Sequence, residues 1–182
     1  MRKITLYIAM SLDGYIADSN GNVDWLSGQC DDIENANTYS AFIKDIDTVV
    51  MGWNTYYQVV TELSPDEWAY SQLTSYIITH RILPSTDKLK FVQENPCDLV
   101  QRLKRQPGQG IWICGGAEII HPLIQADLID EYYISIIPIL LGSGIQLWKE
   151  TGNKVKLKLI RTQSYNGITE LVYTQRCPKC TL

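Results

Sequence analysis

The sequence predicts one soluble α/β domain built around a mixed, mainly parallel β-sheet. Short apolar runs alternate with segments of helical spacing along most of the 182-residue chain, which is the pattern of strand–helix–strand units. The runs at 48–51 and 111–114 are apolar on both faces, as expected of central parallel strands. Near the end, Asn166-Gly167 separates two β-rich runs and favours a tight hairpin, so the sheet should close with antiparallel edge strands.

The strands are predicted from runs of apolar and β-branched residues. The first run resembles a weak signal peptide, but it is broken at Ser11 and Asp13, so we expect a buried first strand. In chain order, the predicted strands are 3–10, 47–51, 74–79, 111–114, 130–137, 156–164 and 168–175.

Four helices are predicted from apolar residues at helical spacing. In the third, Asn95 can cap the first turn and Pro96 suits its first position. The fourth should begin after Gly115-Gly116 and be kinked or shortened by Pro122. The first three are expected at 31–44, 53–60 and 96–105.

No repeat or long linker divides the chain, so we expect a single domain over 1–176 and a short tail over 177–182. The five cysteines are an odd number and indicate free thiols. The tail motif Cys177-Pro178-Lys179-Cys180 resembles half of a zinc ribbon, but no second pair supplies four ligands, so no metal site is predicted.

Charge and hydropathy exclude several classes of partner. The formal net charge of −4 is unsuited to a surface that neutralises nucleic-acid phosphates. No apolar run approaches the length needed to cross a bilayer. We therefore expect no nucleic-acid or membrane partner and a cytoplasmic location.

Two glycine turns are candidate phosphate sites. Gly52 follows a predicted buried strand, and Trp53-Asn54-Thr55 then opens a helix whose free N–H groups favour an anion. Gly115-Gly116 repeats the arrangement and lets the backbone approach a bulky group closely. Either turn alone is explained by a simple change of chain direction, but two together favour a pyrophosphate. Neither matches the Rossmann fingerprint or the P-loop.

Five motifs follow one another along nearly the whole chain: Ala9–Ala17 (AMSLDGYIA), Val50-Met51-Gly52 with Thr55-Tyr56, Ile77-Ile78-Thr79, Gly115-Gly116, and Pro138 with Leu141-Gly142-Ser143-Gly144. In order and spacing they resemble the dihydrofolate reductase-like family, most closely its branch containing the reductase domain of riboflavin biosynthesis, the RibD C-terminal domain. The resemblance implies that family's three-layer fold, a nicotinamide dinucleotide cofactor and a homodimer, to which Glu131-Tyr132-Tyr133 is suited to supply contacts.

The same resemblance implies which residues line the cofactor groove, with NADPH as the expected cofactor and NADH as the alternative. Ala9, Ile16 and Ala17 would contact the nicotinamide half, and Thr79 and His80 would lie near the adenosine end. The residues expected at the phosphates are Gly52, Trp53, Asn54, Thr55, Gly115, Gly116, Ala117 and Glu118.

The sequence departs from the family at two positions. Trp53 stands where an arginine usually follows the glycine and pairs with the extra phosphate of NADPH, which weakens the NADPH prediction unless His80 or Arg81 compensates. Cys114 stands where the riboflavin branch often has glutamate, which weakens the prediction that the riboflavin intermediate itself is the substrate.

Asp13 is the candidate catalytic residue. A carboxyl shielded by a loop can have its pKa raised toward the working pH, and could then orient or protonate the substrate. The alternative is that Asp13 only caps the loop backbone at an Asp-Gly turn. Trp25 and Trp148 are either substrate-stacking rings or packing residues, and His121 is expected to be structural rather than catalytic.

The combined prediction is an NAD(P)H-dependent reductase. It would transfer hydride to a small substrate such as a pyrimidine ribosylamine, of the 5-amino-6-(5-phosphoribosylamino)uracil type, or a pterin. The alternative is a non-catalytic, dimeric dinucleotide-binding protein with the same fold. A zinc deaminase is excluded because its paired His/Cys-x-Glu and Pro-Cys-x-x-Cys motifs are missing.

Overall fold

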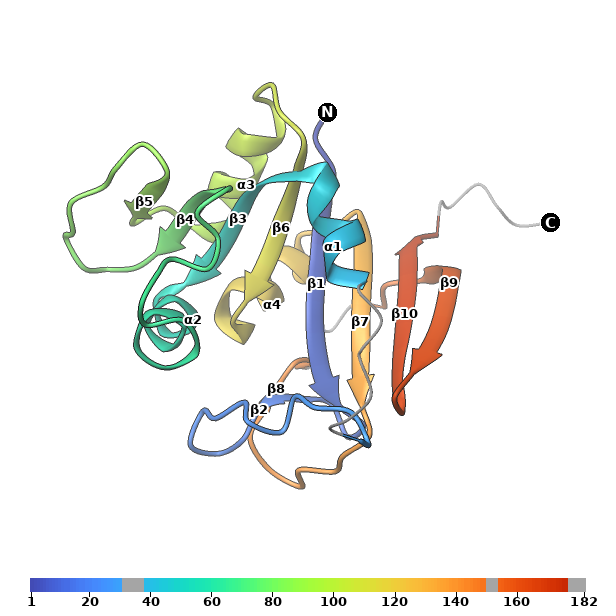
Figure 1. Ribbon diagram of the computed structural model, residues 1–182. Helices are drawn as coiled ribbons and strands as arrows, with labels where there is room; N and C mark the ends of the chain where they lie inside the picture. Colours follow the sequence, from blue (N-terminus) through green and yellow to red (C-terminus); the bar gives the residue numbers. More distant parts are fainter. Residues whose placement is uncertain (31–37, 150–153, 177–182) are drawn as a thin grey trace.

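An eight-stranded mixed sheet forms the centre of the protein (Figure 1). The computed structural model describes residues 1–30, 38–149 and 154–176. The spatial order is β5-β4-β3-β6-β1-β7-β10-β9, in which β5 through β7 are parallel and β10 is antiparallel to both neighbours. The strands are β1 (Ile4–Ser11), β3 (Ile46–Gly52), β4 (Thr74–Ile78), β5 (Leu89–Val92), β6 (Gly110–Gly115), β7 (Glu131–Ile137), β9 (Leu157–Tyr165) and β10 (Ile168–Gln175).

All seven predicted strands are present, and the predicted fold class is confirmed. The prediction missed β5 and the separate two-stranded sheet of β2 (Tyr15–Ala17) and β8 (Ile145–Gln146). These three strands are short, and only Ala17 among their residues is buried. They therefore lack the alternation or continuous apolarity by which a strand is recognised.

The helices largely follow the predicted ranges. The structure has α1 (Thr38–Phe42) followed by a 3₁₀ turn, η1 (Ile43–Asp45), and α2 (Trp53–Gln58) continued by a wider turn, η2 (Val59–Leu63). The first part of the helix predicted over 31–44 lies outside the described residues. Further along are α3 (Pro96–Lys104) and α4 (Ala117–Gln125).

Two local predictions about helix ends can be checked directly. The side chain of Asn95 accepts a hydrogen bond from the Cys97 N–H at 2.9 Å, which confirms it as the cap of α3. Pro122 does not end α4, because the helix continues for three more residues to Gln125. Of the two effects expected of Pro122, a kink or an earlier end of the helix, the earlier end is therefore not observed.

Alternate residues of the central strands pack into two different layers. Ile111 and Ile113 belong to a cluster with Leu103 of α3 and Leu123 of α4 on one face of the sheet. Trp112, between them in sequence, belongs to a second cluster on the other face. There the ring of Tyr7 stacks on Phe42 of α1, with centroids 4.4 Å apart. The sheet is thus covered on both faces, which explains why its central strands are apolar throughout.

The chain ends in the predicted hairpin. Asn166 and Gly167 have positive φ angles of 45° and 76°, and they connect the antiparallel strands β9 and β10. Cys30, Cys97 and Cys114 are free thiols, whereas the tail predicted over 177–182 lies outside the described residues. Within the part of the chain that the structure describes, no helix is long and apolar enough to span a bilayer, and no group of acidic, cysteine or histidine side chains is arranged to hold a metal ion.

We predict that Leu123→Ala destabilises the protein by about 2–5 kcal/mol, because it opens a cavity between α4 and the sheet. Leu123 has no exposed surface, whereas Leu140, the matched control, is 68% exposed. Leu140→Ala should change the free energy of unfolding by less than about 0.5 kcal/mol. Urea denaturation measures both values, and equal effects of the two substitutions would contradict the described core.

Candidate functional site

The carboxyl ends of the parallel strands meet at one edge of the sheet, the lower edge in Figure 1. From β3 the chain continues to β4 on one side, whereas from β6 it continues to β7 on the other side. Open α/β sheets bind ligands outside the carboxyl edge where successive connections diverge in this way. The neighbouring strands β3 and β6 therefore mark the position to examine.

Both glycine turns lie at this position. Met51 of β3 pairs with Gly115 of β6, and a side-chain Cβ added to Gly116 would lie 3.5 Å from the hydroxyl of Thr55. Gly115 has a φ angle of +136°, a conformation that side chains disfavour. The structure thus brings Gly52, Thr55 and the glycine pair together, as the sequence predicted.

The N-terminus of α4 opens beside the glycine pair. Its cap residue, Gly116, provides no side-chain hydrogen bond, so the first N–H groups of the helix are available to an anion. The carboxylate of Glu118 is exposed and binds Lys149 at 2.7 Å, and this ion pair lowers the pKa of Glu118. Ala117 and Glu118 can therefore contact a ligand through their backbone, while the Glu118 carboxylate is held by Lys149.

At the end of β4, a positive charge lies over the ring of Trp53. The guanidinium carbon of Arg81 is 4.6 Å from the Trp53 ring centroid, which is a cation–π contact. The Trp53 ring also stacks on that of Tyr57, with centroids 6.0 Å apart, and is tilted against that of Phe91 of β5, with centroids 6.5 Å apart. A guanidinium charge therefore lies beside Trp53, carried by Arg81 in the turn that follows β4.

Thr79 and His80 lie between β4 and Arg81. Thr79 is buried, its N–H donates to the carbonyl of Val92 at 2.9 Å, and its hydroxyl accepts from the N–H of Arg81 at 3.1 Å. The side chain of His80 is exposed. Thr79 therefore shapes the turn that presents Arg81, and His80 is accessible to a ligand.

The carboxylate of Asp13 holds two loops together. It accepts hydrogen bonds from the hydroxyl of Ser11 at 2.6 Å and from the N–H groups of Leu141 and Gly142 at 3.1 and 2.7 Å. These hydrogen bonds, that of Ser11 foremost, lower the pKa of Asp13. The raised pKa predicted from the sequence was wrong, because the carboxylate is exposed and surrounded by donors. The geometry supports the capping alternative, although the capped backbone belongs to a distant loop.

The segment after Asp13 continues into the small second sheet. In β2, Ile16 packs against the main core and Ala17 is buried, while Ala9 lies further back on β1, where it pairs with Ser135. The carbonyl of Gly14 accepts from the N–H of Leu147 at 2.9 Å. Ala9, Ile16 and Ala17, which are expected near a nicotinamide, therefore lie at the carboxyl edge of the sheet or in the loop beside it.

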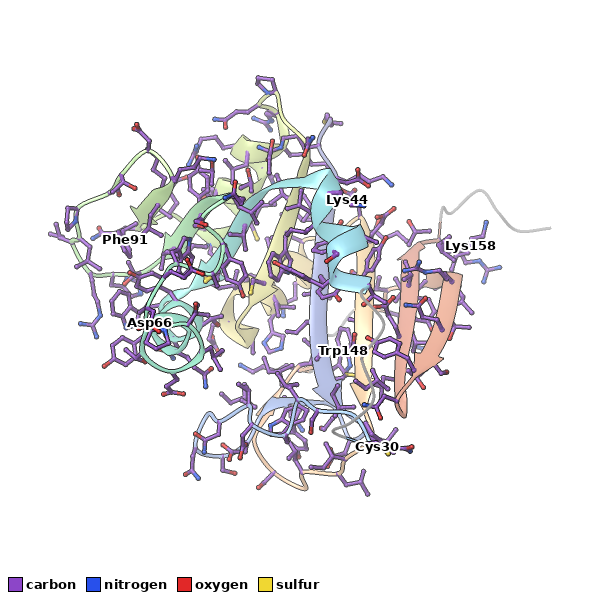
Figure 2. All side chains as sticks on the ribbon, viewed as in Figure 1. Cys30, Lys44, Asp66, Phe91, Trp148 and Lys158 are labelled. Carbon is purple, nitrogen blue, oxygen red and sulfur yellow. The ribbon has the colours of Figure 1, made fainter. Side chains whose placement is uncertain are left out.

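The tryptophans and the buried histidine have distinct surroundings. Trp148 is 42% exposed and lies beside Gly14 (Figure 2), so it can contact a ligand at the carboxyl edge. Trp25 is partly buried and donates to the carbonyl of Asn22. The Nε2 atom of buried His121 is 2.7 Å from the Leu147 carbonyl, which supports its expected structural role.

Two further side chains bear on the chemistry. Burial raises the pKa of the Cys114 thiol to about 12, so Cys114 is protonated at neutral pH and is not a nucleophile. Glu170 of β10 has no exposed surface, and the sequence analysis did not identify it. The available signal was its spacing, because Ile168 and Val172, two residues to either side, are both buried.

A hollow of about 410 Å³ lies at the opposite, amino-terminal edge of the strands, lined by Arg2 and Thr5 among others. The side chain of Arg2 already donates hydrogen bonds within the fold, to Asp47, Thr48 and the carbonyl of Gln109. None of the residues predicted to bind a ligand lines this hollow. The carboxyl edge is therefore the better candidate site.

The chain matches the family model described as the RibD C-terminal domain over residues 2–171. It is 39% identical over 179 residues to the uncharacterized protein YwjB of Bacillus subtilis (strain 168), with 96% of this chain and 98% of that protein covered. A crystal structure from Shewanella sp. PV-4, provisionally described as a riboflavin biosynthesis protein, has a TM-score of 0.80 at 30% identity and covers 97% of this chain and 100% of that one.

The fold extends to dihydrofolate reductases. The Enterococcus faecalis enzyme, complexed with NADP(H) and RAB-propyl, has a TM-score of 0.67 at 16% identity, with 96% of this chain and 97% of that one covered. The resemblance predicted from the sequence is confirmed by the family match, and the predicted fold class by the structural matches.

We predict a pH-dependent loss of stability in Asp13→Asn. The pKa of Asp13 in the folded protein lies below its ordinary value of 3.8, so the carboxylate stabilises the fold above that pH and loses its effect as the pH falls through the lower, folded-state value. The variant should have a lower urea midpoint than the wild type at pH 6, and this difference should shrink below about pH 4.

Asp24→Asn is the control, because it removes the same charge from an exposed aspartate of the neighbouring segment. Its urea midpoint should follow that of the wild type at both pH values. A constant difference between wild type and Asp13→Asn from pH 6 to pH 3 would contradict the assigned role of the carboxylate.

Proposed function

We propose that this chain, which belongs to the RibD C-terminal domain family, is a nicotinamide-dependent reductase. It would deliver hydride to a small heterocyclic substrate at the carboxyl edge of the sheet. The observation that carries this proposal is the surface formed where the two strand-to-helix turns adjoin, with the Thr55 hydroxyl beside the Gly115-Gly116 pair. Such a surface suits a pyrophosphate, which needs close backbone N–H groups.

The residues present fit a nicotinamide dinucleotide. The backbone from Gly115 to Glu118, with Gly52, Trp53, Asn54 and Thr55, would hold the phosphates, while Ala9, Ile16 and Ala17 would contact the nicotinamide half. Thr79 and His80 would flank the adenosine. The cofactor supplies the hydride, so the protein has to bind, orient and shield two rings.

NADPH is the preferred cofactor in this proposal. The extra phosphate of NADPH would lie near the adenosine end, where Arg81 already stands over Trp53. An arginine can donate two parallel hydrogen bonds to a phosphate, and the tryptophan ring restricts its motion. Trp53 would thus act as a platform for the charge rather than as its replacement.

The proposed substrate is a pyrimidine ribosylamine or a pterin. The riboflavin branch contains a reductase of 5-amino-6-(5-phosphoribosylamino)uracil, and the exposed ring of Trp148 offers a flat surface for a heterocycle at the same edge. Asp13 would act as a positioning residue, because its hydrogen bonds to Leu141 and Gly142 order the loop on which a substrate would rest. Two copies are proposed to form a dimer, as the resemblance implies.

The second candidate function is dinucleotide binding without catalysis. The surroundings of Asp13 favour it, because a lowered pKa and three hydrogen bonds make the Asp13 carboxylate unsuited to donate a proton. A protein of this kind would bind NADPH but reduce neither a pterin nor a pyrimidine ribosylamine. Turnover of either compound, followed by the loss of reduced nicotinamide absorbance, would exclude it.

We predict that Arg81→Ala weakens NADPH binding about tenfold to a hundredfold, because a charge-assisted contact to the extra phosphate is lost. NADH binding should change by less than about twofold, since NADH lacks that phosphate. Titration of both cofactors, followed by intrinsic tryptophan fluorescence, measures the two affinities. Arg105→Ala, at the far end of α3, is the control and should alter neither.

Two outcomes would count against the proposal in different ways. If the wild type binds neither NADPH nor NADH, the reductase function is rejected. If Arg81→Ala weakens both cofactors equally, the cofactor site stands but Arg81 does not select the extra phosphate.

A further inference from the structure

Glu170 is a buried carboxylate with one oxygen left unpaired. Its Oε1 atom accepts hydrogen bonds from Arg161 and from Gln163, both at 3.1 Å. Its Oε2 atom is buried and has no partner among the described residues. A buried carboxylate oxygen that accepts no hydrogen bond raises the free energy of the folded protein. A donor supplied by a bound ligand would lower it.

Glu170 lies in one row across the sheet with the expected nicotinamide contact Ala9. Ala9 of β1 pairs with Ser135 of β7, Ser135 pairs with Glu170 of β10, and Glu170 pairs with Gln163 of β9. Residues paired directly across strands project from the same face. Adjacent strands are about 4.8 Å apart, so Glu170 is about 10 Å from Ala9 along this row.

Only small side chains lie between Glu170 and Ala9 on that row, and Ser135 and Glu170 are both buried there. Ala9 and Ser135 have short side chains, whereas the next row toward the amino ends is filled by Tyr7 and Tyr133, whose ring centroids are 5.9 Å apart. Burial raises the pKa of each tyrosine, and the nearby negative charge of Glu170 adds to both rises. The tyrosines therefore stay protonated and form one wall beside the carboxylate.

The charge balance of this position indicates a neutral ligand. Arg161 compensates the charge of Glu170, and its side chain is half exposed while that of Glu170 is fully buried. What Oε2 lacks is a hydrogen-bond donor and not a balancing charge. A neutral ring with an N–H group supplies that donor, whereas a cationic ligand would be repelled by the nearby Arg161.

A purely structural role explains Glu170 less well. Ile168 and Val172 occupy the equivalent positions two residues away and are buried without polar groups. Replacing a buried ion pair by apolar residues is often neutral or stabilising. A carboxylate kept at this position with a free oxygen is therefore better explained by a ligand than by the fold.

We infer that Glu170 binds the substrate, with its free Oε2 accepting a hydrogen bond from a ring N–H of a neutral pyrimidinone that lies over Ala9 and Ser135. Arg161 and Gln163 are positioning residues, because they hold Oε1 and so direct Oε2 toward the ligand. This inference rests on the proposed function, since it takes the region near Ala9 as the place where substrate and cofactor meet.

The test uses two probes that differ only at the ring nitrogens: 5,6-diaminouracil and 5,6-diamino-1,3-dimethyluracil. Binding of each is measured by isothermal titration calorimetry, to cofactor-free and to NADPH-saturated protein. The wild type should bind 5,6-diaminouracil at least about tenfold more tightly than the dimethyl compound, because only the former offers ring N–H groups. Equal binding of the two probes, or binding of neither, overturns the inference without any substitution.

Glu170→Gln should abolish this preference. Arg161 and Gln163 both donate to Oε1, so the amide oxygen keeps that position and the amide NH₂ replaces Oε2, where it opposes the N–H of the ligand. NADPH affinity should stay within about twofold and the melting temperature within a few degrees of the wild type. Glu94→Gln, which removes a carboxylate from a surface ion pair with Arg102, should keep the preference.

The outcomes distinguish a failure of the proposed function from a failure of the role assigned to Glu170. Failure of the wild type to bind NADPH rejects the proposed function, while the probe preference of the cofactor-free protein still decides the role of Glu170. Retention of the tenfold preference in Glu170→Gln rejects the role of Glu170 and leaves the cofactor proposal intact.

Discussion

The parallel pairing of β3 with β6 is the constraint on which the candidate site depends. Both strands are buried on both faces, so their position at the centre of the sheet follows from the burial of Val49, Val50, Ile111 and Ile113. Once the two strands are paired, the turns that follow them open at the same edge and bring Gly52 next to Gly115. The position of the proposed ligand surface is thus a consequence of core packing.

Much of this fold could be predicted from the sequence because the signals were local. Apolar runs gave the central strands, Asn95 gave the start of α3, and Asn166-Gly167 gave the final hairpin, since each depends on residues close together in the chain. The short strands β2, β5 and β8 could not be predicted, because they form only against partners supplied by the rest of the fold.

The chemistry of the site was less predictable, for the same reason. The position of Arg81 over Trp53 depends on the pairing of β4 with β3. The pKa of Asp13 is lowered first by the nearby hydroxyl of Ser11, but the backbone donors that lower it further are 128 and 129 residues away. The proposed role of Glu170 depends on the row it shares with Ala9, which requires the registers of two strand pairs, β1 with β7 and β7 with β10, to be known. Sequence motifs located the loops and turns, but the partners of their charged groups are set by tertiary structure.

The attachment of the segment after β7 has a consequence for how such proteins diverge. Leu141 and Gly142 are bound to Asp13 through their N–H groups, and Leu147 is bound to Gly14 and His121 through its N–H and carbonyl. The segment makes each of these contacts through its own backbone atoms, while side chains such as those of Leu140 and Ile145 face solvent. Substitutions at these exposed positions can accumulate without loosening the segment, so its outer surface can diverge among relatives while its attachment to the sheet stays the same.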